Sequence, residues 1–179
     1  RIAIKVNSMN DADIMAQLVR ASAAGTEVEL FVRGICCLRP GVPGRTEHIS
    51  VRSIIGRYLE HERIFVFGRG EAQEVFIGSG DLLERNTVRR IEAFTAVTDQ
   101  NARAEVLEVL SAMRRDNRQA WIMQPDGSYL RPEPTGVSQT YLHTYFAGRT
   151  VQKPAASAAA QPQKKLPWWR RLWNWLKNN

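Results

Sequence analysis

Cysteines are scarce in this chain, and long apolar runs are absent from it. The two cysteines, Cys36 and Cys37, are adjacent, and a disulfide between neighbours would strain the peptide that joins them. No further thiol completes a zinc-binding set, so we expect both to be small buried packing residues. The sequence shows neither a signal peptide nor an apolar segment of about twenty residues. We therefore expect a reducing, cytoplasmic location.

Acidic residues are absent from residues 148–179. The chain has 25 Lys and Arg residues against 18 Asp and Glu residues, and seven of the basic residues lie in this segment. The rest of the chain is therefore balanced, and the excess positive charge is a property of the tail. Such a distribution does not indicate a uniformly basic surface, so we expect no nucleic-acid partner.

The first part of the chain predicts a strand–helix–strand unit. Residues 1–7 alternate apolar and polar side chains, as a strand does, and residues 26–34 predict a second strand. Between them, residues 8–25 predict a helix with Ser8 or Asn10 at its N-cap. A unit of this length favours parallel strands joined by a right-handed crossover.

Further elements follow at short intervals and extend the α/β pattern. Strands are expected at 48–54, 63–68, 74–80 and 89–97, a hairpin at 120–132, and helices at 99–117 and 137–148. We expect one domain, residues 1–148. Residues 149–165 are rich in Ala, Pro and Gln and predict a disordered linker.

A histidine beside a cation is the first candidate for chemistry. His61 lies two residues before Arg63 at the start of a predicted strand, and the turn 78–81 (Gly-Ser-Gly-Asp) follows. A histidine can move a proton or attack a phosphoryl group, and a neighbouring cation stabilises charge on phosphate oxygens. A Gly-Ser turn lets the backbone come close to an anion. The alternative is a surface histidine and an ordinary tight turn.

Arginines are concentrated around this histidine, with six between residues 33 and 63. The planar guanidinium can hold a phosphate at two points. Arg33 ends a strand of the predicted parallel unit, which is where ligands of open α/β sheets bind. Arg85, Arg89 and Arg90 form a second cluster after the Gly-Ser turn. The alternative for any one of them is a solvated side chain or an ion pair with a nearby glutamate.

Four segments together resemble the C-terminal part of bacterial polyphosphate kinase. They are VNSMNDADI at 6–14, LFVRGICCLRPGVPG at 30–44, IGRYLEH at 55–61 and GSGDLLERNTVRRIEA at 78–93. That family reversibly transfers the terminal phosphate of ATP to a polyphosphate chain. The resemblance is close to about residue 100 and looser to 148. It implies a phospholipase D-like α/β fold, a mixed sheet flanked by helices.

The resemblance also implies roles for single residues. It implies that Arg33 binds ATP. It implies that His61 also contacts ATP and has a catalytic role in proton transfer at the transferred group. A cationic channel for polyphosphate would be lined by Arg39, Arg63, Ser79, Arg89 and Arg90. The usual Lys and Asn of the phospholipase D superfamily are replaced here by Arg63 and Asp81, which argues against phosphodiester hydrolysis.

The resemblance places other parts of the machinery in a preceding domain. The histidine that becomes phosphorylated and the ligands of Mg²⁺ lie there in the family, so no metal ligand is expected in this segment. The implied partners are ATP, polyphosphate, the upstream domains of the same chain and further copies in a homo-oligomer. The chain begins on a strand without Met. We therefore expect a piece of a longer protein that does not turn over alone.

The end of the chain raises a separate hypothesis. Residues 166–179 hold four of the five tryptophans, and at about 100° per residue these fall on one helical face with the cations opposite. This pattern predicts an amphipathic helix. Three roles remain open: peripheral binding to an anionic inner membrane, packing on the body or a sister subunit, and binding of polyphosphate or another partner.

Two other functions remain open beside the kinase. One is a phosphodiesterase or phosphatidyltransferase of the phospholipase D superfamily, which the tail would suit. The other is a non-catalytic polyanion-binding module tethered to a membrane. The coding sequence upstream of Arg1 discriminates between them, because a preceding domain with its own catalytic histidine is expected only for the kinase.

Overall fold

Residues 1–132 are described by a computed structural model, and all of them belong to a unit that spans residues 1–148. The second unit comprises residues 149–179. The predicted closing helix 137–148, the linker 149–165 and the tail helix 166–179 lie outside the described residues. Within residues 1–132, no helix is long and apolar enough to cross a membrane.

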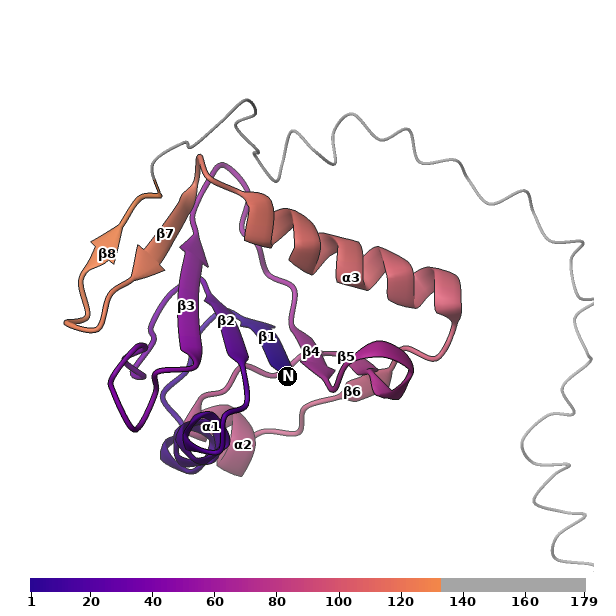
Figure 1. The fold of residues 1–179 in the computed structure, drawn as a ribbon. Helices are drawn as coiled ribbons and strands as arrows, with labels where there is room; N and C mark the ends of the chain where they lie inside the picture. Colours follow the sequence, from indigo (N-terminus) through magenta and orange to yellow (C-terminus); the bar gives the residue numbers. More distant parts are fainter. Residues whose placement is uncertain (133–179) are drawn as a thin grey trace, which may run out of the picture. The chain divides into compact units, whose positions relative to one another are not determined.

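An eight-stranded sheet carries helices on its two faces (Figure 1). The strands, in the order β6-β5-β4-β1-β2-β3-β7-β8 across the sheet, are β1 (Ile2–Val6), β2 (Val28–Val32), β3 (Ile49–Ile54), β4 (Ile64–Phe67), β5 (Glu74–Gly78), β6 (Phe94–Ala96), β7 (Ala120–Met123) and β8 (Tyr129–Leu130). The helices are α1 (Ala12–Ala23), α2 (Glu84–Arg89) and α3 (Gln100–Arg115), with a short 3-10 turn, η1 (Gly70–Ala72).

Strand direction decides where the loops meet. Strands β1, β2 and β3 run parallel, with Ile4 beside Leu30 and Leu30 beside Val51, whereas every other pair is antiparallel. The predicted strand–helix–strand unit and the mixed sheet are thereby confirmed. One edge therefore collects the ends of β1, β2, β3 and β5 and the starts of β4, β6 and β7. We call it the carboxyl edge, and the loop 55–63 rises from it in Figure 1.

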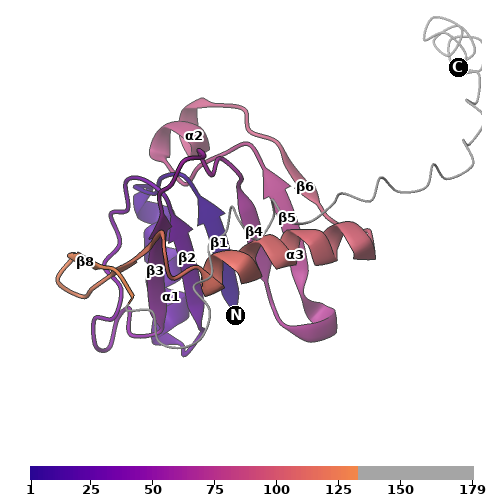
Figure 2. The same ribbon diagram turned by 90° about the horizontal axis from the view of Figure 1, so that it is seen from above.

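The sheet is buried on both faces, which explains why its central strands are almost wholly apolar. On one face, Ile4, Val6 and Leu30 pack with Leu18 of α1. On the other, Ala3 and Phe31 belong to a cluster that includes Leu110 and Met113 of α3. Figure 2 shows α3 crossing one face of the sheet, with α1 behind it.

Two local expectations were wrong. The N-cap of α1 is Asp11, whose carboxylate accepts the N–H of Ile14 at 3.0 Å, because the amide oxygen of Asn10 accepts the N–H of Glu84 instead. The strand expected at 89–97 covers only Phe94–Ala96. Arg89 belongs to α2, and the apolar side chains of Val88 and Ile91 are exposed to solvent. Their apolar character was therefore not evidence for a strand. All three residues of β6 are exposed as well.

The cysteines are free thiols in different surroundings. The backbone of Cys36 forms an isolated parallel β-bridge with that of Met9. The Cys36 side chain is partly buried against the core on the α1 face, and this burial raises the pKa of its thiol. Cys37 is exposed, so the expectation of two buried residues was wrong for it. Neighbours in extended backbone point to opposite sides, which places only one of them against the core.

Candidate active site

The carboxyl edge gathers most of the residues that the sequence singled out. Arg33 follows β2 directly, and His61 and Arg63 immediately precede β4. Ser79 follows β5, whose end lies at the same edge because β5 runs antiparallel to β4. Residues from distant parts of the sequence therefore meet where ligands of open α/β sheets bind.

Arg63 is fixed by an ion pair with Asp81. The guanidinium Nε lies 3.2 Å from Oδ1 and Nη2 lies 3.4 Å from Oδ2, and Oδ1 also accepts the backbone N–H of Asn7 at 2.7 Å. Burial alone would raise the pKa of Asp81, but these two donors outweigh it and hold the pKa below its usual value. Asp81 thus ties Arg63 to the end of β1.

Arg63 in turn holds His61. Its Nη1 lies 3.0 Å from the imidazole Nδ1 and donates to the His61 carbonyl at 3.0 Å. A guanidinium donates hydrogen bonds and accepts none, so Nδ1 must be the acceptor. Neutral His61 therefore carries its proton on Nε2. This imidazole is exposed and can offer that proton to a ligand.

Two other cations hold the backbone of the same loop. Nη1 of Arg33 donates to the carbonyl of Leu59 at 2.8 Å. Nζ of Lys5, on β1, donates to the carbonyl of Glu60 at 2.8 Å and to that of Glu62 at 3.4 Å. Lys5 is only 2% exposed, and this burial lowers the pKa of its ammonium, with the carboxylate of Glu62 offsetting part of the effect.

Arg33 also borders a hollow of the surface. A pocket of about 330 Å³ is lined by Arg33, Ser53, Ile55, Trp121 and Tyr129. Its lining combines one guanidinium with aromatic and aliphatic side chains. Such a surface suits a ligand with a flat apolar part and an anionic part.

The serine of the Gly-Ser turn is hydrogen-bonded to nearby residues of the same chain. The Ser79 hydroxyl donates to the carboxylate of Glu92 and accepts the N–H of Ala93 at 3.1 Å. The hydrogen bond from Ser79, followed by that from Asn86, lowers the pKa of Glu92. A Cβ on Gly78 would lie 2.5 Å from the Phe94 ring, so this glycine is required by packing. The turn therefore presents a carboxylate beside the serine.

The remaining arginines lie in different places. Arg90 borders a pocket of about 330 Å³ with Asp81 and Glu92. Arg89 borders another of about 400 Å³, which includes Ser8 at the end of β1. Both therefore flank the carboxyl edge.

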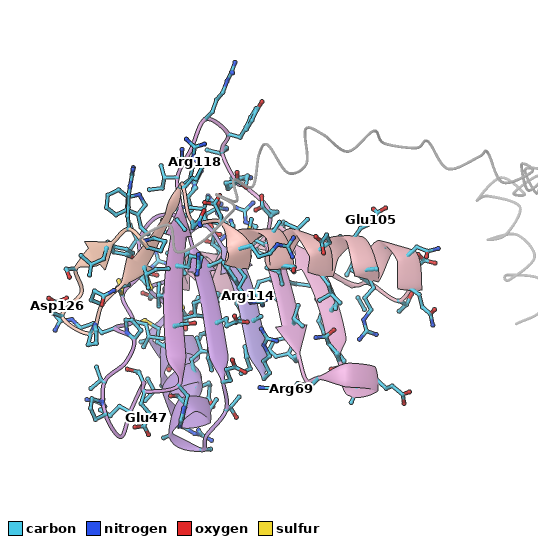
Figure 3. The ribbon with its side chains drawn as sticks, turned by 45° about the horizontal axis from the view of Figure 1, so that its top comes forward. Glu47, Arg69, Glu105, Arg114, Arg118 and Asp126 are labelled. Atoms are coloured by element: carbon cyan, nitrogen blue, oxygen red, sulfur yellow. The ribbon has the colours of Figure 1, made fainter. Side chains whose placement is uncertain are left out.

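Arg39 lines a different pocket from Arg33, and the two pockets share Gly34 and Tyr129. It borders a pocket of about 510 Å³ with Cys37, Asp126 and Gly127, and Figure 3 shows Asp126 at the tip of the β7–β8 hairpin. Hydrogen bonds from Ser128 lower the pKa of Asp126, and Arg39 contributes a smaller part. Arg39 therefore faces the hairpin tip.

Metal ligands of the usual kind do not cluster in the described part of the chain. Among residues 1–132, no group of three or more His, Cys, Asp and Glu side chains could hold a metal ion. The carboxylates at the edge are engaged with Arg63 and Ser79.

Sequence reasoning missed Lys5 as a member of the site, although a signal existed. Lys5 is the one charged residue inside the strand Ile2–Val6, which is covered on both faces. A lysine in such a strand must find polar partners, because an unpaired buried charge is costly. The aromatic pair beside Arg33, Trp121 and Tyr129, gave no comparable signal, since it depends on how the β7–β8 hairpin packs.

These features define an open α/β domain whose carboxyl edge carries a histidine among cations. The family model described as "Polyphosphate kinase C-terminal domain 2" matches residues 1–141. The chain therefore belongs to that family, as the sequence resemblance indicated.

Individual relatives agree with this assignment. A polyphosphate kinase of Thermosynechococcus vestitus is 46% identical over 153 residues, which cover 85% of this chain and 21% of the relative. One of Rhodopirellula baltica is 43% identical over 169 residues, covering 91% of this chain and 20% of the relative. The chain thus spans about a fifth of the length of these relatives.

One solved structure gives the same picture of the fold. The crystal structure of polyphosphate kinase from Porphyromonas gingivalis matches with a TM-score of 0.77 and 35% identity, covering 82% of this chain and 23% of that one. A phospholipase D family member, Nuc from Salmonella typhimurium, matches 73% of the chain with a TM-score of 0.48 and 18% identity.

Proposed function

We propose that this chain is the ATP-contacting C-terminal region of a polyphosphate kinase. The whole enzyme would transfer the terminal phosphate of ATP reversibly to polyphosphate, through a phosphohistidine in an upstream domain. Family membership over residues 1–141 supports this proposal, and so do the relatives that carry the enzyme's name. A homo-oligomer and contacts with the upstream domains of the same chain belong to the same proposal.

The contact between Arg63 and His61 carries the chemical part of the proposal. Because Nδ1 accepts from Arg63 at 3.0 Å, neutral His61 offers an Nε2 proton to an oxygen of the transferred phosphoryl group. A donor of this kind stabilises the charge that collects on phosphate oxygens during transfer. His61 therefore acts as a proton or hydrogen-bond donor in this scheme.

Arg33 would hold the phosphates of ATP beside the loop that carries His61. One of its N–H groups is used on the carbonyl of Leu59, and a guanidinium has further donors for an anion. Arg89 and Arg90 flank the same edge and would extend the cationic surface for polyphosphate. Arg63 is engaged by Asp81, and Ser79 by Glu92, so we assign them to the support of the site.

ATP and Mg²⁺ are the implied substrate and cofactor. The carboxylates of the described edge do not form a metal-ligand cluster, so we propose that upstream residues hold the metal. The ion would neutralise phosphate charge when bound. The residues of this chain would orient the nucleotide and supply the proton on His61.

The experiment is ATP-dependent polyphosphate synthesis by the full-length enzyme that contains this chain. His61→Ala should lower the rate on the order of 10²- to 10⁴-fold, the usual contribution of a positioned proton donor. Arg33→Met should raise the KM for ATP. Arg69→Ala is the control, because Arg69 pairs with Glu27 at the opposite edge of the sheet. Full activity of His61→Ala would overturn the proposal.

A related expectation concerns the 179 residues by themselves. They should not synthesise polyphosphate from ATP, because the phosphorylated histidine and the metal ligands are proposed to lie upstream. Measurable ATP-dependent synthesis by this segment would refute that part of the proposal.

We propose that the tail, residues 166–179, binds an anionic membrane surface. Its tryptophan face and its cationic face support the proposal at the level of sequence. Co-sedimentation with vesicles of anionic lipid should be stronger for the intact chain than for residues 1–150. Equal sedimentation of the two would end this idea.

A further inference from the structure

Four successive backbone carbonyls around His61 each accept a hydrogen bond from a cationic side chain. The pairs are Leu59 with Arg33 at 2.8 Å, Glu60 with Lys5 at 2.8 Å, His61 with Arg63 at 3.0 Å and Glu62 with Lys5 at 3.4 Å. We call residues 59–62 the histidine loop. Its path is thus held by side chains that come from β1, from the end of β2 and from the start of β4.

Lys5 differs from the two arginines because it cannot reach a ligand. Its side chain is 3% exposed, whereas Arg63 is 14% exposed and Arg33 borders an open pocket. Its hydrogen bonds go to the carbonyls on either side of His61, and its ion pair joins the Glu62 carboxylate at 3.6 Å. The buried ammonium therefore acts on the histidine loop alone.

The backbone of Glu60 shows why such a hold is needed. Glu60 is the one residue other than glycine with a positive φ, 51°, among residues 1–132. Residues with a Cβ seldom adopt this left-handed region, because the Cβ comes too close to the following carbonyl oxygen. The conformation persists only where surrounding contacts determine it. The carbonyl of Glu60 itself accepts a hydrogen bond from Lys5 Nζ.

We propose that Lys5 is a positioning residue for His61, acting through the two carbonyls that flank it. The inference rests on the proposed function of His61 and adds how the imidazole is held at the carboxyl edge. Arg63 sets the ring through Nδ1, while Lys5 sets the backbone from which the ring projects. Displacement by about 1 Å at a reacting group can cost on the order of 10²-fold in rate.

The sheet offers a matched control. Lys5 pairs with Phe31 on the neighbouring strand, and Phe31 pairs with Arg52 on the next, so the three stand in one row. Arg52 is also a cation that donates from a strand to a backbone carbonyl, that of Asp116 at 2.8 Å. It therefore matches Lys5 in kind but holds the end of α3.

The first measurement is amide hydrogen exchange, read by mass spectrometry on the full-length kinase. Lys5→Met keeps the apolar stem and removes the donor. It should speed exchange in the peptide covering 58–63 at least tenfold and leave the peptide covering 116–121 unchanged. Arg52→Met should show the reverse pattern. If exchange at 58–63 is unchanged in Lys5→Met, the proposal is overturned, whatever the activity of His61→Ala.

The second measurement is a double-mutant cycle in polyphosphate synthesis. Lys5→Met should lower kcat about 10- to 100-fold while the KM for ATP changes less than threefold. In the His61→Ala background the same change should have almost no further effect, because Lys5 acts through His61. An equal factor in both backgrounds shows a purely structural role and overturns the inference.

The two levels of failure are separable. If His61→Ala retains full activity, the proposed function of His61 fails, and the exchange data still decide whether Lys5 holds the loop. If His61→Ala is too slow to measure, the exchange comparison decides alone. If Lys5→Met does not fold, as judged by its thermal unfolding, Lys5→Gln keeps an N–H donor and enters the same exchange experiment and cycle.

Discussion

Arg63 and Asp81 form an ion pair across 18 residues of sequence, with Nε and Oδ1 3.2 Å apart. Both positions stand out in the sequence, Arg63 as the cation beside His61 and Asp81 as the last residue of the Gly-Ser turn. Their side chains contact each other, so the Asp81 carboxylate neutralises the Arg63 guanidinium. The same guanidinium contacts His61, so the ion pair also fixes the group that holds the histidine.

Asp81→Asn should lower the free energy of unfolding by about 1.5–3 kcal/mol at pH 7, the range for hydrogen bonds to a charged group. The pKa of Asp81 is depressed in the folded protein, so its contribution is present above the unfolded pKa of about 3.9 and is lost as pH falls through the folded pKa. Urea unfolding at pH 7, 5 and 3 should show the difference between variant and parent shrinking towards acid. Glu105→Gln, on the exposed side of α3, is the control.

Substitutions at Glu60 should separate backbone strain from charge. Glu60→Val and Glu60→Asn remove the same carboxylate, but asparagine tolerates a positive φ and a β-branched residue does not. The valine variant should therefore be about 1–2 kcal/mol less stable than the asparagine variant. Thermal or urea unfolding of both proteins measures this difference. Equal stabilities would mean that the loop relaxes from its left-handed conformation.

Gly78→Ala should destabilise the sheet by about 1–3 kcal/mol, because the new Cβ would lie 2.5 Å from the Phe94 ring. In a Phe94→Ala background the same substitution should cost clearly less. Unfolding measurements on the four proteins of this cycle give the coupling between the two positions. Additive costs would show that the glycine is needed for a reason other than the ring.

The two thiols should react at different rates. Cys37 is exposed, whereas burial of Cys36 raises the pKa of its thiol and lowers its thiolate fraction. Alkylation with iodoacetamide at pH 8 should modify Cys37 first, as peptide mass spectrometry can follow. Cys37→Ser should leave polyphosphate synthesis unchanged. Faster labelling of Cys36 would contradict this description of the loop.

Much of the fold could be predicted from local patterns. Residues 1–7 and 26–34 predicted β1 and β2, because a sheet covered on both faces leaves a strong apolar signal in its central strands. Residues 8–25 predicted α1 through the capping residues at its start. The limits of β6 could not be predicted. Val88 and Ile91 are apolar but exposed, so their spacing carried no information about the sheet.

Only part of the candidate site could be predicted from the sequence. His61 and Arg33 stood out through their residue types and their places at strand ends. The contacts that hold them could not be predicted, because Lys5 reaches the histidine loop and Asp81 reaches Arg63 only after β1, β4 and β5 have paired. The place of Arg39 beside the β7–β8 hairpin could not be predicted either, because it depends on how that hairpin packs.

The outer strand β6 leaves one side of the sheet open within residues 1–132, where it pairs only with β5. Phe94 in this strand is exposed, and so are Ile91 and Val88, which precede it. An open strand edge with apolar neighbours is a template for strand addition between molecules. Self-association of this segment would then begin at β6. Thr95→Lys would place a charge on this strand and so disfavour strand addition there.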